Sequence, residues 1–277
     1  WLAPDGSLCF GHRRLSIIDL TDRASQPMQD ASGRLTLTYN GEIYNYKELR
    51  AELSGAGANF RSESDSEVIL EAYRKWGDAC LDRFNGMFAF ALYDAKHDRI
   101  LCARDRLGEK PFLFAEDAGF FAFASDYKAL LTLEGVGPDI DDNLLAQFLV
   151  TPSNALDQDR NTLFHDIQQL LPGEKLVLNT RDLSFNVSSY WRPLSTSVLS
   201  GVPAKDAVPA FKSLLEDAVR IRLRSDVRVG SCLSGGLDSG SITCIARDLV
   251  GDTTDYDTFT GRFPGSDSDE GTWAEIV

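Results

Sequence analysis

The segment Ser234-Gly235-Gly236-Leu237-Asp238-Ser239 constrains the fold of this chain most strongly, because it separates a strand pattern from a helix pattern. The apolar stretch from Val227 to Leu233 predicts a buried strand. After the segment, apolar side chains recur at helical spacing, namely Ile242, Ile245, Ala246 and Leu249. A glycine-rich turn in this position leaves backbone N–H groups at the positive end of the helix dipole. The pattern therefore predicts an α/β unit whose strand-to-helix turn binds an anion.

The side chains of this turn indicate a phosphate as the anion. Gly235 and Gly236 let the backbone close on a phosphate because neither has a Cβ. Ser234 and Ser239 can donate from their hydroxyls, and Asp238 can hold a Mg²⁺ ion that offsets the phosphate charge. The Gly-Lys-Ser/Thr sequence of a Walker loop does not follow. An ordinary turn with an incidental glycine pair is the competing interpretation.

Charge and hydropathy limit the partners to be expected. The chain has 277 residues, of which 43% are hydrophobic, so one large domain or two ordinary ones are expected. Its net charge of −14 disfavours nonspecific binding to nucleic acid or to anionic membranes. No apolar run approaches the roughly 20 residues that cross a bilayer, and we expect no signal peptide. We therefore expect no nucleic-acid and no membrane partner.

The cysteines argue for a reducing compartment. The five are scattered, odd in number and without a Cys-x-x-Cys pair: Cys9, Cys80, Cys102, Cys232 and Cys244. This pattern favours neither a disulfide framework nor a zinc site, so we expect a cytoplasmic protein.

Two domains are expected from the order of the patterns. Short apolar or alternating runs predict strands at 35–39, 87–93, 100–103, 112–115 and 120–124, with helices at 66–75 and 143–149. We place the first domain at 1–193, a Ser-, Gly- and Pro-containing linker at 194–204 and the second domain at 205–277. The second domain opens with an amphipathic helix marked by Val208, Phe211, Leu215, Ala218 and Val219. A further strand is expected at 257–263.

Three places in the first domain have two local interpretations each. Arg14, on a strand-like apolar run, is either a strand-edge residue or a planar fork for a carboxylate. Asn40-Gly41 is the commonest hairpin dipeptide, yet it can also supply two N–H donors to an oxyanion. Asp65 lies within Ser64-x-x-Glu67, a capping-box pattern, so helix capping competes with ligand binding there. Local sequence leaves these alternatives open.

The order of several longer motifs carries a family resemblance. They are Gly11-His12-Arg13-Arg14-Leu15-Ser16-Ile17-Ile18-Asp19, Gln26-Pro27-Met28, Tyr39-Asn40-Gly41-Glu42-Ile43-Tyr44-Asn45, Ser64-Asp65-Ser66-Glu67-Val68-Ile69, Gly86-Met87-Phe88-Ala89-Phe90-Ala91, Arg104-Asp105-Arg106-Leu107-Gly108, Phe123-Ala124-Ser125-Asp126 and Leu171-Pro172-Gly173. In this order, and with the Ser234–Ser239 turn, the chain resembles the glutamine-hydrolysing asparagine synthetases. The resemblance implies an α+β, N-terminal-nucleophile αββα sandwich, followed by the start of an α/β parallel-sheet domain of the ATP-pyrophosphatase type.

The same resemblance implies the roles of individual residues. Asn40 and Gly41 would form the oxyanion hole. The glutamine-binding residues would be Arg14, Leu15, Ser16, Ile17, Ile18, Asn40, Gly41, Glu42 and Asp65, with Arg14 on the α-carboxylate and Asp65 on the α-ammonium group. The ATP-binding residues would be Leu233, Ser234, Gly235, Gly236, Leu237, Asp238, Ser239 and Gly261, with Asp238 as the Mg²⁺ ligand.

The implied reaction is ATP-dependent synthesis of asparagine from aspartate, with ammonia from glutamine and an aspartyl-adenylate intermediate, giving AMP and pyrophosphate. The implied partners are glutamine, aspartate and ATP, and a homodimer is allowed. The alternatives are an amidotransferase acting on a sugar, peptide or exopolysaccharide acid, a β-lactam synthetase, and a non-catalytic glutamine-binding module. The intact Arg14, Asn40-Gly41 and Asp65 set disfavours the second alternative, and the Ser234–Ser239 turn disfavours the third.

The nucleophile that the resemblance implies is a cysteine with a free α-amine. Trp1 is not a cysteine, and the nitrogen of Cys9 is in a peptide bond, so we expect Cys9 to be a small buried residue at a strand start. We interpret the chain as a fragment of a longer protein that is poorly soluble or partly molten alone. It should recognise glutamine without hydrolysing it, and it should form no AMP.

Overall fold

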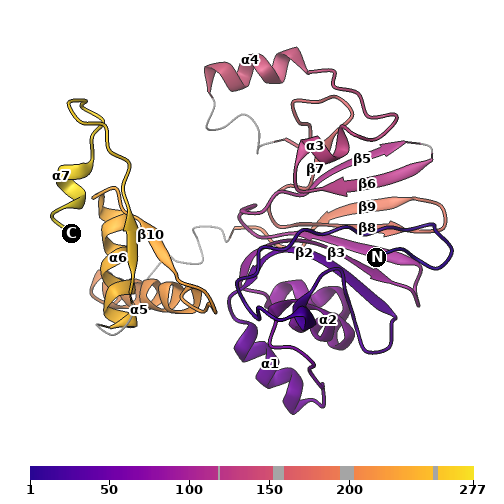
Figure 1. Cartoon of the computed structure of the whole chain (residues 1–277), viewed down its shortest axis with the longest axis horizontal. Coiled ribbons are helices and arrows are strands. Elements are labelled where there is room, and N and C mark those ends of the chain that lie inside the picture. The colour runs from indigo at the N-terminus through magenta and orange to yellow at the C-terminus, as the bar shows by residue number, and fades with distance from the viewer. Residues whose placement is uncertain (118, 152–158, 194–202, 252–254) are drawn as a thin grey trace. The chain divides into compact units, whose positions relative to one another are not determined.

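A computed structural model describes residues 1–117, 119–151, 159–193, 203–251 and 255–277 (Figure 1). The chain divides into two compact units. The first joins Trp1–Leu15 to Thr21–Pro193, and the second joins Ser16–Leu20 to the described part of Leu194–Val277. Most of the expected linker at 194–204 lies outside the described residues. In the described ranges, no helix combines the length and the apolar character that crossing a membrane requires.

A six-stranded antiparallel sheet is the centre of the first unit. Its strands lie in the order β1-β2-β3-β4-β8-β9. They span Met28–Gln29, Leu35–Ile43, Gly86–Asp94, Arg99–Arg104, Glu174–Asn179 and Phe185–Ser189. The strands expected at 35–39, 87–93 and 100–103 are confirmed as β2, β3 and β4. The central strand β3 is apolar at almost every position because both faces of the sheet are covered.

Helices cover one face of this sheet and a second sheet covers the other (Figure 1). On the helical side lie α1 (Tyr46–Gly55) and α2 (Asp65–Trp76), followed by the 3₁₀ turn η2 (Gly77–Arg83); a shorter one, η1, spans Asp22–Ala24. The second sheet has the order β6-β5-β7, with bounds Phe120–Ala124, Leu113–Asp117 and Gln168–Gln169. The helix α3 (Tyr127–Leu130) packs on β5 and β6, and α4 (Asp142–Val150) follows it. The layers are therefore those of the expected αββα sandwich.

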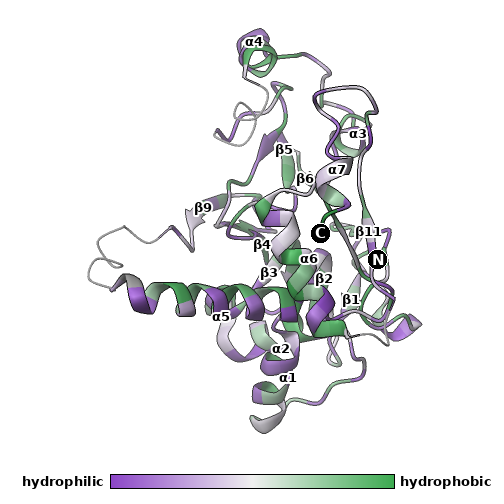
Figure 2. Cartoon of the chain, turned by 90° about the vertical axis from the view of Figure 1, so that its left-hand side faces the viewer, coloured by the Kyte–Doolittle hydropathy of each residue, from purple (hydrophilic) through white to green (hydrophobic). Residues whose placement is uncertain are grey.

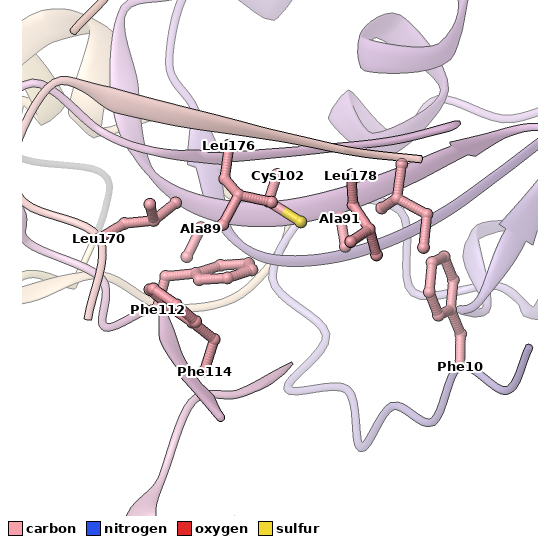
Figure 3. Close-up of a cluster of buried hydrophobic side chains, with 10 residues drawn as sticks. Phe10, Ala89, Ala91, Cys102, Phe112, Phe114, Leu170, Leu176 and Leu178 are labelled. Carbon is pink, nitrogen blue, oxygen red and sulfur yellow. The ribbon is translucent and has the colours of Figure 1, made fainter. Parts of the chain in front are cut away.

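The space between the two sheets holds a hydrophobic core (Figure 3). Its buried members are Phe10, Ala89, Ala91, Ile100, Cys102, Phe112, Phe114, Leu170, Leu176 and Leu178. Small residues of β3 face the large rings of Phe112 and Phe114, so the two sheets can interdigitate. Burial raises the pKa of the Cys102 thiol well above its ordinary value. Cys9, in contrast, is exposed; the expectation of a buried Cys9 is wrong because its neighbour Phe10 takes the core position.

The second unit contains α5 (Ala204–Arg222), β10 (Gly230–Cys232), α6 (Leu237–Val250), β11 (Asp257–Phe259) and α7 (Gly271–Ala274). Strands β10 and β11 pair in parallel, as expected for an α/β unit. The buried strand predicted at 227–233 is wrong in length and burial, since β10 has three residues and Val227 is 42% exposed. The strand predicted at 257–263 likewise ends at Phe259. The sheet of this unit has two described strands, so it offers little surface on which helices can bury apolar side chains. Helix α5 accordingly carries exposed apolar side chains among its polar ones (Figure 2).

Candidate functional site

Strand β2 carries Asn40 and Gly41, and it continues through both residues as a partner of β3. The hairpin turn that this dipeptide allowed is therefore wrong. Gly41 has φ +147°, and a Cβ on it would lie 2.0 Å from Met87 O on the neighbouring strand. A Cβ on Gly86 would lie 2.1 Å from Glu42 O. Glycine at both positions therefore allows the two backbones to run this close beside Asn40.

Alternate residues at this end of β2 direct their backbone N–H groups away from β3. The Tyr39 N–H donates to Gln26 Oε1 at 2.7 Å, and the Ile43 N–H donates to Asp65 Oδ2 at 3.0 Å. Gly41 lies midway between these residues, so the two-residue period of a strand directs its N–H to the same edge. The Gly41 N–H thus belongs to a row of donors whose outer members are bound by side chains.

The side chain of Asn40 leaves the plane of the sheet on the side of the second sheet. Its Nδ2 donates to Ser125 Oγ at 3.3 Å, and Ser125 directly follows β6. A carboxamide nitrogen carries two N–H bonds, so the same group can also serve a ligand oxygen. Asn40 therefore stands as a half-buried donor held by the end of the second sheet.

The start of α2 forms only half of the predicted capping box. Ser64 Oγ accepts the N–H of Ser66 at 3.1 Å, as an N-cap should. The carboxylate of Glu67 does not return to Ser64; it accepts the N–H groups of Arg61 and Ser62 at 2.7–3.0 Å. Ser64 therefore caps the helix without Asp65, whose carboxylate is directed elsewhere.

Asp65 and Glu42 form a region of excess negative charge. Asp65 is 4% exposed, and burial raises its pKa although Ile43 N–H and Tyr39 O–H donate to its Oδ2 at 3.0 and 2.8 Å. Burial and the charge of Asp65 also raise the pKa of Glu42, while the charge of Lys110 acts in the opposite direction. A single lysine offsets the charge of two carboxylates only in part. An ammonium group bound between them would stabilise the ionised form of both.

The loop that carries Lys110 is held by two buried charged residues that are neighbours in the sequence, Arg104 and Asp105. The Asp105 carboxylate accepts the N–H of Lys110 and of Phe88 at 3.0 and 3.1 Å, and it also accepts the N–H groups of Leu107 and Glu109. The Arg104 guanidinium donates to Lys110 O at 2.8 Å and also to Gly108 O and Leu170 O. Phe88 is the β3 residue opposite Gly41, so this loop supports the same end of the sheet.

Arg14 lies in a segment without regular structure, so its placement on a strand-like run is wrong. The segment meets β2 through the Thr38 side chain rather than through a ladder, since Thr38 Oγ1 lies 3.4 Å from both Gly11 O and His12 Nδ1. Burial and the charge of Arg14 lower the pKa of His12. Thr38 lies on the same face of β2 as Asn40, so His12, which contacts Thr38, lies on that face too.

The other predicted glutamine-binding residues that follow Arg14 are divided between the two units. Leu15 belongs to the first unit and is 83% exposed, whereas Ser16, Ile17 and Ile18 group with the second unit. Ile18 is buried. A role for these residues in the glutamine pocket stays a prediction.

The Ser234–Ser239 turn connects β10 to α6, as the pattern predicted. Its serines bond within the turn: the hydroxyls of Ser234 and Ser239 lie 2.8 Å apart, and the Gly236 N–H lies 3.3 Å from Ser234 Oγ. Gly235 has φ +76°, and a Cβ on it would lie 2.4 Å from the carbonyl carbon of Trp273. The turn is therefore preformed at the N-terminus of a helix, which suits a phosphate.

The remaining predicted nucleotide residues surround this turn. Leu233 is buried and its N–H donates to Phe259 O at 2.9 Å, which ties the turn to β11. Leu237 and Asp238 are exposed in the first turn of α6, and Gly261 is exposed beyond β11. Within the described ranges, no three His, Cys, Asp or Glu side chains gather as a metal site.

Comparison with known proteins defines the class to which this fold and site belong. Residues 2–191 match the family described as "Glutamine amidotransferase domain", and residues 210–277 match that described as "Asparagine synthase". The chain belongs to the glutamine amidotransferase family, with a class-II domain of the N-terminal-nucleophile type and an asparagine synthase segment behind it. The expected family and fold class are thereby confirmed.

Individual relatives make the similarity more particular. The chain is 38% identical over 240 residues to glutamine-hydrolyzing asparagine synthetase 3 of Bacillus subtilis, covering 86% of this chain and 38% of the relative. It is 34% identical over 287 residues to a putative asparagine synthetase of Methanocaldococcus jannaschii, covering 98% and 54%. A PRPP amidotransferase structure from B. subtilis is 17% identical with a TM-score of 0.46, covering 89% of this chain and 50% of that one. The chain thus spans about half, or less, of the length of these relatives.

Sequence reasoning missed several residues that support the site. Two of them bond a predicted site residue directly, Tyr39 to Asp65 and Ser125 to Asn40, and the charge of Lys110 acts on Glu42. Gln26 and Asp105 bond residues next to the site, namely Tyr39 and Phe88. Each lies within or directly beside a recognised motif, and that position was the available signal. Their roles depend on contacts with residues far away in the sequence, which no local pattern reports.

Proposed function

We propose that the first domain binds L-glutamine at the end of β2 and that the second binds ATP at the Ser234–Ser239 turn. The observation that carries the proposal is the row of β2 N–H groups, in which Gly41 lies between donors bound by Gln26 and Asp65. This arrangement sets an oxyanion donor beside two carboxylates whose charge Lys110 offsets only in part. The proposed overall reaction of the ligase is synthesis of asparagine from aspartate, glutamine and ATP, with AMP and pyrophosphate as products.

The α-carbon end of glutamine is recognised by charge. Asp65 and Glu42 accept the α-ammonium group, whose positive charge offsets the excess negative charge of the pair. Arg14 grips the α-carboxylate with two parallel N–H donors, a geometry that a lysine cannot reproduce. The positive charge of Lys110 offsets part of the negative charge of Glu42 when no ligand is bound.

The amide end of glutamine lies against the oxyanion donors. The Asn40 side chain and the Gly41 N–H stabilise the negative oxygen that develops when a nucleophile attacks the amide carbon. Loss of one such donor typically lowers the rate by about 100- to 1000-fold. The nucleophile would be a cysteine with a free α-amine.

The nucleotide end depends on a helix N-terminus and one carboxylate. The N–H groups around Gly235 and Gly236 would face the pyrophosphate, Asp238 would hold Mg²⁺, and Leu233 and Gly261 would lie beside the adenosine. Bound Mg²⁺ supplies positive charge that offsets the charge developing on the phosphates. ATP supplies the adenylyl group that activates the acceptor carboxylate as an aspartyl-adenylate.

Aspartate is the acceptor we propose, because the relatives named above are asparagine synthetases. Amidation of a sugar, peptide or exopolysaccharide acid stays the alternative. A homodimer and a cytoplasmic location remain predictions that accompany this function.

The direct test is calorimetric titration of the 277-residue chain with L-glutamine. We expect saturable binding without release of glutamate, and Asp65→Asn should weaken the binding about tenfold or more, since it removes the charge that faces the ammonium group. Asp141→Asn is the matched control, because Asp141 caps α4 with its carboxylate and asparagine also caps well. No binding of L-glutamine by the folded chain would refute the proposed site, and glutamate formation would refute the requirement for a free-amine cysteine.

A further inference from the structure

Tyr39 is a buried tyrosine whose hydroxyl meets a buried carboxylate. Tyr39 is 3% exposed and Asp65 is 4% exposed. The Tyr39 O–H donates to Asp65 Oδ2 at 2.8 Å, and the same oxygen accepts the Ile43 N–H at 3.0 Å. Both donors come from β2, so this strand fixes one carboxylate oxygen from two points. Hydrogen bonds to a buried ionised oxygen are among the stronger ones in proteins.

The second oxygen of the carboxylate is held less tightly. Ser64 Oγ lies 3.4 Å from Asp65 Oδ1, which is a long contact, and the Ser66 N–H also stabilises the ionised carboxylate. An ionised carboxylate has about four acceptor positions, so Oδ1 can accept N–H bonds from a ligand. Rotation of the carboxylate away from its position would break both bonds to β2. The direction of Oδ1 is therefore determined by what Oδ2 contacts.

The side chain of Gln26 connects the two elements that carry this pair. Its Oε1 accepts the Tyr39 N–H at 2.7 Å, and its Nε2 donates to Ser66 Oγ at 3.3 Å. Ser66 lies in the first turn of α2, next to Asp65. Gln26 thus ties the strand position of Tyr39 to the helix turn of Asp65 through a single planar amide.

We propose that Tyr39 is a positioning residue that turns Oδ1 of Asp65 toward the α-ammonium group of the ligand, and that Gln26 maintains this arrangement. The role rests on the glutamine site proposed above, because it assigns the ammonium group to Asp65. Neither residue touches the ligand. Their effect is confined to recognition of the ammonium group, so replacing them should not change the affinity for a ligand without that group.

Removing the hydroxyl has a predictable chemical effect on Asp65. Burial already raises the pKa of Asp65, and loss of a donor to the ionised form raises it further. The charge of Asp65 in turn raises the pKa of Glu42 on β2, while the charge of Lys110 lowers it. As the pH falls, Asp65 therefore loses its charge earlier in the chain without the Tyr39 hydroxyl than in the wild-type chain. Binding of the ammonium-bearing ligand should weaken most there.

The experiment compares two ligands that differ only in the ammonium group. The 277-residue chain is titrated calorimetrically with L-glutamine and with glutaramate, which lacks the α-amino group, at mildly acidic and mildly alkaline pH. We expect the wild-type chain to prefer L-glutamine. Tyr39→Phe should reduce this preference about tenfold, more at the acidic pH, with little change for glutaramate. Gln26→Met should shift the preference in the same direction.

Tyr73→Phe is the matched control, because Tyr73 is also buried and its hydroxyl lies 3.2 Å from the buried carboxylate of Asp94. It should lower the melting temperature without altering the preference. If the wild type prefers L-glutamine and a folded Tyr39→Phe or Gln26→Met chain keeps that preference in full, the positioning role is refuted while the glutamine site stands. If the wild type shows no preference, the proposed ammonium site itself fails, and the role of Tyr39 fails with it.

Discussion

Replacing Gly41 with alanine tests the close approach of β2 and β3 beside Asn40. The added Cβ would lie 2.0 Å from Met87 O and 2.7 Å from Phe88 Cα, and both neighbours are backbone atoms of the paired strand β3. The φ of +147° adds strain for any residue with a Cβ. The backbone therefore has to shift, because no flexible side chain can yield.

Gly33→Ala separates the two contributions. Gly33 also has positive φ, +71°, yet a Cβ there would meet nothing within 4 Å. Its replacement should cost only the backbone term, about 1–2 kcal/mol of unfolding free energy. Gly41→Ala should cost this term and an overpacking term of about 1–3 kcal/mol. For a domain of this size, the difference corresponds to a melting temperature roughly 2–12 °C lower than that of Gly33→Ala.

The assay is thermal unfolding of both variants by circular dichroism, combined with calorimetric titration of L-glutamine. We expect Gly41→Ala to lose glutamine binding even below its melting temperature, because the shift moves the Gly41 N–H and the adjacent Asn40. Gly33→Ala should keep the wild-type affinity, since it lies in the turn between β1 and β2. Equal melting temperatures and equal affinities for the two variants would show that β2 and β3 are not in close contact at Gly41. The argument that Asn40 and the Gly41 N–H form an oxyanion hole would then fail.

Three further outcomes follow from the structure. Arg14→Lys should weaken L-glutamine binding about tenfold at unchanged melting temperature, because a point charge replaces a fork; a parallel fall in stability would indicate a structural arginine instead. Asp238→Asn should reduce the Mg²⁺-dependent part of ATP binding and leave glutamine binding intact; unchanged Mg²⁺ dependence would exclude this carboxylate as the ligand. Asp94 is buried, which opposes its ionisation, but hydrogen bonds from Arg34 and His97 hold its pKa well below the ordinary value. Its contribution to stability is therefore present above about pH 4 and is lost as the pH falls further, so Asp94→Asn should flatten the acid side of the stability profile measured by denaturant unfolding.

The sequence by itself determined the main elements and the class of the protein. The apolar runs at 87–93 and 100–103 became β3 and β4, and the helical spacing after Ser239 became α6, because such periodicities follow from local geometry. The ordered motifs around Arg14, Asn40 and Asp65 were sufficient for the family, since they are long and occur in one sequence order.

The tertiary structure decided which of two local interpretations holds at each site. Asn40-Gly41 continues a strand rather than turning a hairpin, because β3 supplies a partner along its whole length. Asp65 serves neither as cap nor as half of a capping box, because Tyr39 and Ile43 bind its carboxylate from another element. Of the strand predicted at 227–233, only Gly230–Cys232 forms β10, because the sheet of two described strands offers little surface that could bury a longer strand. In each case the outcome depends on a partner distant in the sequence, and the contact forms only when the chain has folded.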